Sequence, residues 1–181
     1  MKNKIFFYLV LFFIFGVILY FNNNQNTKSA YITTNQAPVL GQRTKDSNCQ
    51  INGPLPDKLC TPGAIFLNTT SEQICVKGYS SKARDVSVET KKQVYEEYGI
   101  YTHKTGEYEV DHLISLELGG SNDITNLWPE AANPSPGFHE KDKLENFLHN
   151  EVCNGYISLK DAQQMISSDW LGTYKKYLIG K

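Results

Sequence analysis

Asp111 and His112 stand side by side in an alternating apolar stretch, Tyr108 to Leu116, and Asn126 follows fourteen residues after His112. Hydrolysis of a phosphodiester needs a nucleophilic water, a base that deprotonates it, and a cation that stabilises charge on the phosphate and the leaving oxygen. His112 suits the base, because an unperturbed pKa of about 6.5 leaves imidazole largely neutral at pH 7. Asp111 suits a ligand of a hard cation such as Mg²⁺, which prefers carboxylate oxygen. These residues predict half of a metal-dependent nuclease site.

The local backbone must bring both side chains to one site. Adjacent residues of a strand point to opposite faces, so Asp111 and His112 can act together only where the strand ends or bends. Gly119 and Gly120 supply residues that tolerate a sharp turn. Asn126 can fix that turn by hydrogen-bonding backbone groups.

A strand, a turn, a second strand and a helix are expected around this pair. The pattern predicts strands over 108–116 and 125–128, with the turn at 119–122. A Pro-rich loop over 133–137 then leads into a helix over 138–152, whose apolar residues recur on one face. This helix has to complete the metal site.

The third metal ligand has several candidates in the sequence. Steps of about 100° per residue place His139, Asp142, Asn146 and His149 opposite the apolar face of the helix. Asp142 and Asn146 are spaced four residues apart and can face one cation, whereas His139 lies in the first turn. Asn133, in the preceding loop, is the next candidate.

The flanking segments complete a small α+β fold. We expect a helix over 88–98, capped by Ser87 and ended by Gly99, and a last helix that begins at Ser158 and runs towards Trp170. The short apolar runs 65–67 and 73–76 are predicted as strands. Trp128 and Trp170 are expected in the core.

The N-terminus differs from the rest of the chain. Lys2 and Lys4 precede the uncharged apolar segment 5–21, whose seventeen residues fall between a signal-peptide core and a membrane span. We expect residues 1–21 to be a signal peptide or an N-terminal membrane anchor, with the body outside. Residues 22–48 are polar and aperiodic, which predicts a flexible tether, and the folded domain is expected over 49–178.

The cysteines agree with export. All four lie beyond the apolar segment, and none forms a C-x-x-C pair of the kind that structural zinc sites use: Cys49, Cys60, Cys75 and Cys153. We therefore expect disulfides, for which three pairings are open. Disulfides require an oxidising compartment, periplasmic or extracellular.

The net charge of −1 provides no strong global field towards nucleic acid. Binding to nucleic acid would therefore have to come from a local patch. Lys82 and Arg84 lie in a predicted loop and are candidates for gripping a phosphate.

Several stretches resemble the HNH, or ββα-metal, endonuclease family, and most closely a group of exported bacterial HNH-type proteins. The resemblance covers about residues 49–175 and is carried by these motifs: LPDKLCTPG (55–63), ICVKGY (74–79), EVDHLISLELGG (109–120), NLWPE (126–130), KDKLENFLH (141–149), VCNG (152–155) and AQQMI (162–166). It implies that Asp111 binds metal, His112 is the base and Asn126 orients the loop. The family places a His or Asn near the helix start, and here His139, Asp142 and Asn146 compete for that role.

The sequence thus predicts a small disulfide-bonded α+β domain that contains a ββα-metal (HNH-like) motif and hydrolyses nucleic acid, DNA in the first instance, outside the cytoplasm. The expected cofactor is Mg²⁺, with Mn²⁺, Ni²⁺ or Zn²⁺ as alternatives. Residues 5–21 would contact the membrane if they are not cleaved, and no feature of the sequence identifies an inhibitor protein. The alternatives are a non-catalytic HNH-like module that binds nucleic acid or a surface partner, and a disulfide-stabilised envelope protein. The Asp111-His112 pair favours the enzyme, whereas the near-neutral charge favours the other two.

Overall fold

The two strands around the Asp-His pair form an antiparallel sheet in the computed structural model, which describes residues 41–180. Strand β1 spans Tyr108–His112 and β2 spans Leu127–Ala131, with Asp111 opposite Trp128. The first strand ends four residues earlier than predicted and the second begins two residues later. His112 is therefore the last residue of β1, where the chain leaves the sheet.

The connection between the strands is a folded segment rather than a tight turn. It contains two short 3₁₀ helices, η2 (Leu116–Leu118) and η3 (Ile124–Asn126). Gly120 is required within it, because a Cβ at this position would lie 1.7 Å from the carbonyl oxygen of Ile114. The predicted turn at 119–122 is therefore one part of a longer connection.

The three longer helices were predicted close to their observed bounds. Helix α4 spans Val88–Glu97 and α5 spans Phe138–Cys153. Helix α6 spans Leu159–Tyr174, contains a non-helical residue at Asp169 and continues into a π-helical turn, η4 (Lys175–Ile179). The predicted caps are present, since the hydroxyls of Ser87 and Ser158 accept hydrogen bonds from backbone N–H groups three residues on, at 3.0 Å each.

The two strands predicted over 65–67 and 73–76 were wrong. The second run lies in and after a short helix, α2 (Ser71–Ile74), and helix α3 (Tyr79–Ala83) follows it. Thr70 and Gln73 cap α2 reciprocally, and this local capping outweighs a strand tendency that a short apolar run cannot establish. In the first run, Ile65 forms a single bridge with Gly120.

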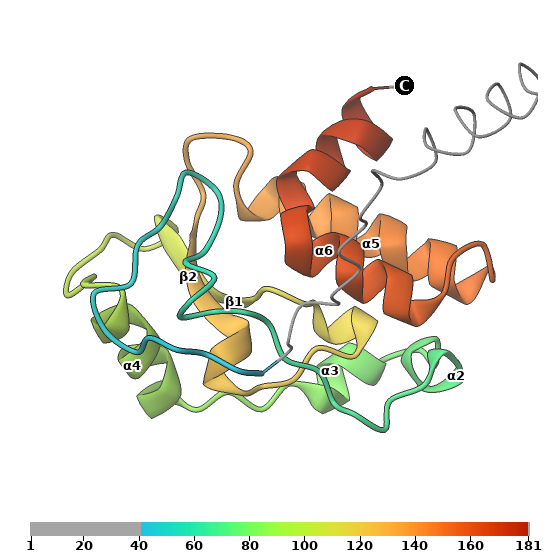
Figure 1. Cartoon of the computed structure of the whole chain (residues 1–181), viewed down its shortest axis with the longest axis horizontal. Helices are drawn as coiled ribbons and strands as arrows, with labels where there is room; N and C mark the ends of the chain where they lie inside the picture. Colours follow the sequence, from blue (N-terminus) through green and yellow to red (C-terminus); the bar gives the residue numbers. More distant parts are fainter. Residues whose placement is uncertain (1–40, 181) are drawn as a thin grey trace, which may run out of the picture. The chain divides into compact units, whose positions relative to one another are not determined.

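Figure 1 shows the sheet between α4 on one side and the neighbouring helices α5 and α6 on the other. The core between these elements is apolar, and among its largest members are Leu113, Ile114, Leu118, Trp128, Leu144, Leu148, Ile166 and Trp170. Both tryptophans are fully buried, as predicted. The described residues thus form an α+β fold in which α5 packs close to the end of β1.

The folded part begins before the predicted boundary at Cys49. Arg43 forms an ion pair with Glu97 at 2.7 Å, and Lys45 forms one with Asp57 at 2.9 Å. Residues 43–48 therefore belong to the folded domain rather than to a tether. The apolar segment 5–21 lies outside the described residues, and no helix within 41–180 is long and apolar enough to cross a membrane.

All four cysteines are paired. Cys49 bonds to Cys60, and Cys75, directly after α2, bonds to Cys153 at the end of α5. Two disulfides are typical of proteins that fold in an oxidising, exported environment.

We expect the two disulfides to differ in their contribution to stability. Cys75 and Cys153 are 78 residues apart and Cys49 and Cys60 are 11 apart. Loop-closure entropy then assigns roughly 4–5 kcal/mol to the first pair and roughly 3 kcal/mol to the second. Urea unfolding of the double Cys→Ser variant of each pair should show the larger loss for Cys75 and Cys153. Equal losses would contradict the entropic account.

Candidate active site

His112 is buried at the end of β1, with 2% of its surface exposed. Its Nε2 lies 3.1 Å from Oδ1 of Asn122, whereas its Nδ1 has no hydrogen-bond partner within residues 41–180. Burial lowers the pKa of His112, and the bond to Asn122 and the charge of Asp111 oppose that shift only in part. A general base requires a neutral ring in which one nitrogen has a lone pair available to accept a proton.

Asn126 holds the connection that follows His112. Its fully buried amide accepts from the N–H groups of Ile114 (2.9 Å) and Ala64 (3.3 Å). It donates to the carbonyls of Ile114 (3.0 Å) and Ser121 (2.9 Å). One side chain thus ties both ends of the connection to each other and to the segment before α2, which is the arrangement expected of a loop anchor.

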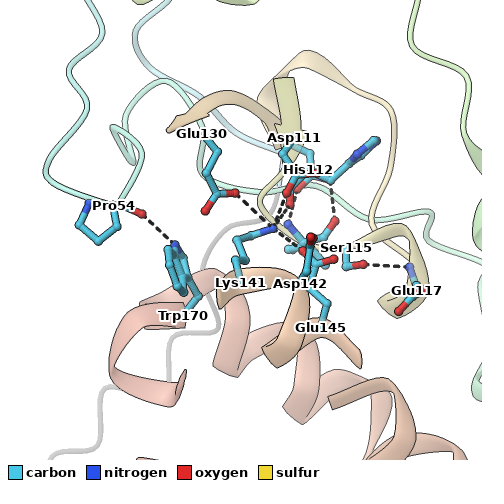
Figure 2. A network of polar contacts seen from close by, with 12 residues as sticks. Pro54, Asp111, His112, Ser115, Glu117, Glu130, Lys141, Asp142, Glu145 and Trp170 are labelled. Atoms are coloured by element: carbon cyan, nitrogen blue, oxygen red, sulfur yellow. Dashed lines mark hydrogen bonds and ion pairs between the residues drawn. The ribbon is translucent and has the colours of Figure 1, made fainter. Parts of the chain in front are cut away.

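Lys141 on α5 was not predicted as a site residue. Its side chain is fully buried between α5 and the sheet. Its Nζ donates to Oδ2 of Asp111 and to the carbonyl of His112, both at 2.7 Å, and to the carboxylate of Glu145. The carboxylate of Glu130 on β2 lies 3.8 Å away. Figure 2 shows these groups converging on the ammonium from both strands and from α5.

The charges in this cluster shift one another's pKa values. Burial alone would lower the pKa of Lys141, but the carboxylates of Asp111, Glu145 and Glu130 raise it well above its ordinary value. Burial raises the pKa of Asp111, yet Lys141 more than offsets this and holds it below its usual range. Burial dominates at Glu145, whose pKa rises to about 7 against the pull of Lys141, and at Glu130, whose pKa rises well above normal. Asp111 is therefore the group that stays ionised beside Lys141.

A signal for Lys141 was present in the sequence. It is spaced three residues before Leu144 and seven before Leu148, on the buried face of α5. A lysine on such a face is rare unless it is paired. A charged residue among the apolar positions of this face, rather than a residue of the polar face, is the feature that indicates the buried ion pair.

His139 and Asp142, the predicted helix ligands, lie on the first turns of α5 and are exposed. With Asp111 they do not form a group of three ligand atoms within 4.8 Å. They are nevertheless electrostatic neighbours: burial and then the charge of Asp111 raise the pKa of Asp142, while His139 opposes that shift. Glu109, two residues before Asp111, has a pKa raised by burial, Asp111 and Asp142.

Three carboxylates in this region disfavour one another's ionisation, at Glu109, Asp111 and Asp142, and oxygen is the donor that Mg²⁺ prefers. Their oxygens do not all lie within 4.8 Å of one another, so a shared cation would require these side chains to move closer together. Glu109 was missed as a candidate, although it shares a strand face with Asp111.

The remaining helix candidates lie elsewhere. The amide of Asn146 donates to the backbone carbonyl of Asp142 at 2.8 Å, within its own helix. His149 Nε2 lies 3.2 Å from the carbonyl of Ile74 and 3.5 Å from Sγ of Cys153. The ligand atoms of Cys75, His149 and Cys153 do cluster within 4.8 Å, but both sulfurs are in the disulfide. Asn133 is exposed in the loop after β2.

Arg84, which follows α3 directly, brings a cation to the site. It is exposed, and its charge adds to the burial that lowers the pKa of His112. It also acts on Asp142, where it opposes the rise in pKa caused by burial and Asp111. Lys82, in the last turn of α3, is exposed as well.

Comparisons with protein-family models, with curated proteins and with solved structures find no match to this chain.

Replacing Lys141 by Met should destabilise the protein by roughly 3–5 kcal/mol, because it leaves buried carboxylates without their counter-charge. The loss should be smaller at pH 5 than at pH 8. Without Lys141 the folded-state pKa of Asp111 rises above its unfolded value and that of Glu145, already raised by burial, rises further, so the folded variant takes up protons as pH falls. Urea unfolding at both pH values measures this.

Lys143→Met is the matched control, since Lys143 lies on the same helix with 62% of its side chain exposed. It should change stability by less than about 0.5 kcal/mol at either pH. Equal effects of the two substitutions would mean that the buried ion cluster does not contribute as described.

Proposed function

We propose that this chain is an exported, metal-dependent endonuclease of the HNH type that hydrolyses phosphodiester bonds of nucleic acid, with DNA as the expected substrate. The observation that carries the proposal is the adjacency of two side chains: His112, whose pKa is lowered by burial and whose Nδ1 has no hydrogen-bond partner within residues 41–180, and Asp111, whose carboxylate is held ionised by Lys141. The order β1, β2, α5 around these residues and the anchoring by Asn126 agree with the motifs that resemble that family.

His112 has the properties of the base. Its buried Nδ1 lacks a partner within the described residues, and a buried polar atom without a hydrogen bond costs about 1–3 kcal/mol. A water molecule donating to this nitrogen would recover that cost and would stand where its proton can be removed. Lys141 holds the carbonyl of the same residue, which fixes the backbone from which the ring projects.

Asp111 and Asp142 are the proposed metal ligands, with His139 as the alternative on α5 and Glu109 beside them. A bound Mg²⁺ there would neutralise charge on a phosphate oxygen and on the leaving oxygen. Lys141 donates to Oδ2 of Asp111, so a cation bound at this carboxylate would share it with the ammonium. The ion pair thereby orients the carboxylate as well as keeping it ionised.

Arg84 supplies the proposed contact with the substrate. Its exposed guanidinium acts electrostatically on both His112 and Asp142, which makes it the candidate for binding the substrate phosphate. Guanidinium pairs with phosphate through two parallel hydrogen bonds, which orients the group as well as attracting it. Lys82 adds charge on α3, the short helix that precedes Arg84.

The full-length, oxidised protein should nick plasmid DNA in the presence of Mg²⁺ or Mn²⁺ and lose this activity in EDTA. His112→Ala should lower the rate by about 10²–10⁴, the usual cost of removing a general base. His103→Ala is the control, because His103 is an exposed histidine that packs against Tyr95. A folded His112→Ala variant that cleaves at the wild-type rate would refute the mechanism.

The helix ligand can be identified by titrating metal into two variants. Asp142→Ala should raise the Mg²⁺ concentration needed for half-maximal nicking, because a charged oxygen donor is lost. If His139 is the ligand instead, His139→Ala should have the larger effect, most clearly with Mn²⁺, Ni²⁺ or Zn²⁺. An unchanged metal requirement in both variants would place the ligand elsewhere.

A non-catalytic module that binds nucleic acid is the second candidate. It is favoured by one observation, that Asp111 is already neutralised by Lys141 while the ligand atoms of His139 and Asp142 do not converge with it. This reading predicts that the wild-type protein shifts the fluorescence anisotropy of labelled DNA but cleaves it with none of the four metals.

A further inference from the structure

Asn122 bridges His112 to a helix that is distant in the sequence. Its Oδ1 lies 3.1 Å from Nε2 of His112, and its Nδ2 lies 2.7 Å from the carbonyl oxygen of Ala83, the last residue of α3. The side chain is partly buried within the connection between β1 and β2. Each end of one amide is therefore committed to a different partner.

The partner at Ala83 fixes which way the amide points. A backbone carbonyl can only accept, so the NH₂ group of Asn122 must face it. Turning the amide over would set its oxygen against the oxygen of Ala83 and lose the 2.7 Å bond. The oxygen of Asn122 consequently faces the histidine ring.

An oxygen at this position determines the tautomer of His112. Because the amide oxygen only accepts, Nε2 must carry the ring proton to form the bond. A neutral imidazole has one N–H, so Nδ1 then presents its lone pair. The opposite tautomer would place two acceptors 3.1 Å apart and a buried N–H at Nδ1 without an acceptor among residues 41–180.

We propose that Asn122 is a positioning residue that sets the tautomer of His112, with the ring proton on Nε2, so that the lone pair of Nδ1 is the one available to take a proton from water. The catalytic part of this proposal rests on the proposed nuclease function, whereas the tautomer is a property of the folded chain. In the step, the water O–H bond breaks, its proton goes to Nδ1, and the hydroxide oxygen forms the new bond to phosphorus. The bond between phosphorus and the leaving oxygen breaks, and that oxygen takes a proton from bulk water.

The same bridge sets the position of Arg84. The carbonyl that fixes Asn122 belongs to the residue directly before Arg84, so one side chain connects the ring of the base to the backbone that carries the cation. Asn122 therefore fixes the position of the end of α3 relative to the end of β1. Substituting Asn122 should therefore affect both the tautomer of His112 and the binding of the substrate phosphate by Arg84.

Nuclear magnetic resonance tests the tautomer independently of any nuclease activity. Long-range ¹H–¹⁵N correlation on the ¹⁵N-labelled, oxidised full-length protein, at a pH where the ring is neutral, should show a protonated Nε2 and an unprotonated Nδ1 for His112. The signals are assigned by their loss in His112→Gln. In Asn122→Ala the preference should weaken towards a mixture of tautomers. A wild-type ring protonated at Nδ1 overturns the proposal.

Cleavage kinetics test the role. Asn122→Ala should lower kcat by about 10–100-fold, by analogy with the loss of a partner that orients a metal-ligating histidine. Asn122→Asp keeps an oxygen that accepts from Nε2 but cannot donate to Ala83, so it should retain more of kcat than Asn122→Ala while KM rises. Asn150→Ala, an exposed asparagine on α5, is the control and should leave both constants unchanged.

The outcomes separate the two proposals. Equal loss of kcat in the Ala and Asp variants, or wild-type kcat in Asn122→Ala, overturns the positioning role even if the protein is a nuclease. A wild-type protein that shows the Nε2–H tautomer but cleaves no nucleic acid refutes the nuclease function and with it the proton transfer, while leaving Asn122 as the residue that sets the tautomer. Should Asn122→Ala fail to fold, Asn122→Asp and the wild-type spectrum still decide.

Discussion

The ammonium of Lys141, buried between the sheet and α5, is the interaction on which the arrangement of this site depends. A charge without solvent is tolerated only when it is paired and fully hydrogen-bonded. Lys141 meets that condition by reaching Asp111 and the carbonyl of His112 on β1, Glu145 on its own helix and the vicinity of Glu130 on β2. Helix α5 can therefore dock on the sheet in one register only, because any slip would leave a buried charge unpaired.

This constraint sets the chemical character of the neighbouring groups. It holds Asp111 ionised while other buried carboxylates in the same cluster favour their protonated forms. It also fixes the end of β1. There Asn122 bonds to the ring of His112, and Asn126 bonds to the backbone of the connection that follows. Lys141 and Asn126 thus bond to backbone groups that the sheet no longer pairs where the strand ends, while Asn122 bonds to the ring of His112, and the residues with catalytic potential lie at that point.

Much of this arrangement could be predicted from residue patterns. Periodicity placed α4, α5 and α6, and the turn chemistry around Gly120 and Asn126 indicated an anchored connection between two strands. Helix α2 was missed because its four residues are too short for periodicity, so that capping decides. Asn122 was missed because its role depends on the carbonyl of Ala83, 39 residues earlier in the chain, which no local pattern reveals.

The same limit applies to the predicted metal ligands. Asp111 and His139 both influence the pKa of Asp142, but spacing along a helix cannot specify whether side chains converge on one point. Lys141 was overlooked for the opposite reason. The predicted helix ligands are polar residues on the solvent-exposed face of α5, whereas Lys141 lies on its buried face.

The disulfide between Cys75 and Cys153 has a consequence for the lifetime of the protein among proteases. The covalent ring that it closes contains Asp111, His112, Asn126 and Lys141, and it also contains the exposed segment 101–107. Exposed loops are the preferred positions of proteolytic nicking. A single cut in that segment would yield two polypeptides that remain joined through sulfur, with β1 and β2 on the same piece. The ring therefore protects the integrity of the site against one broken peptide bond.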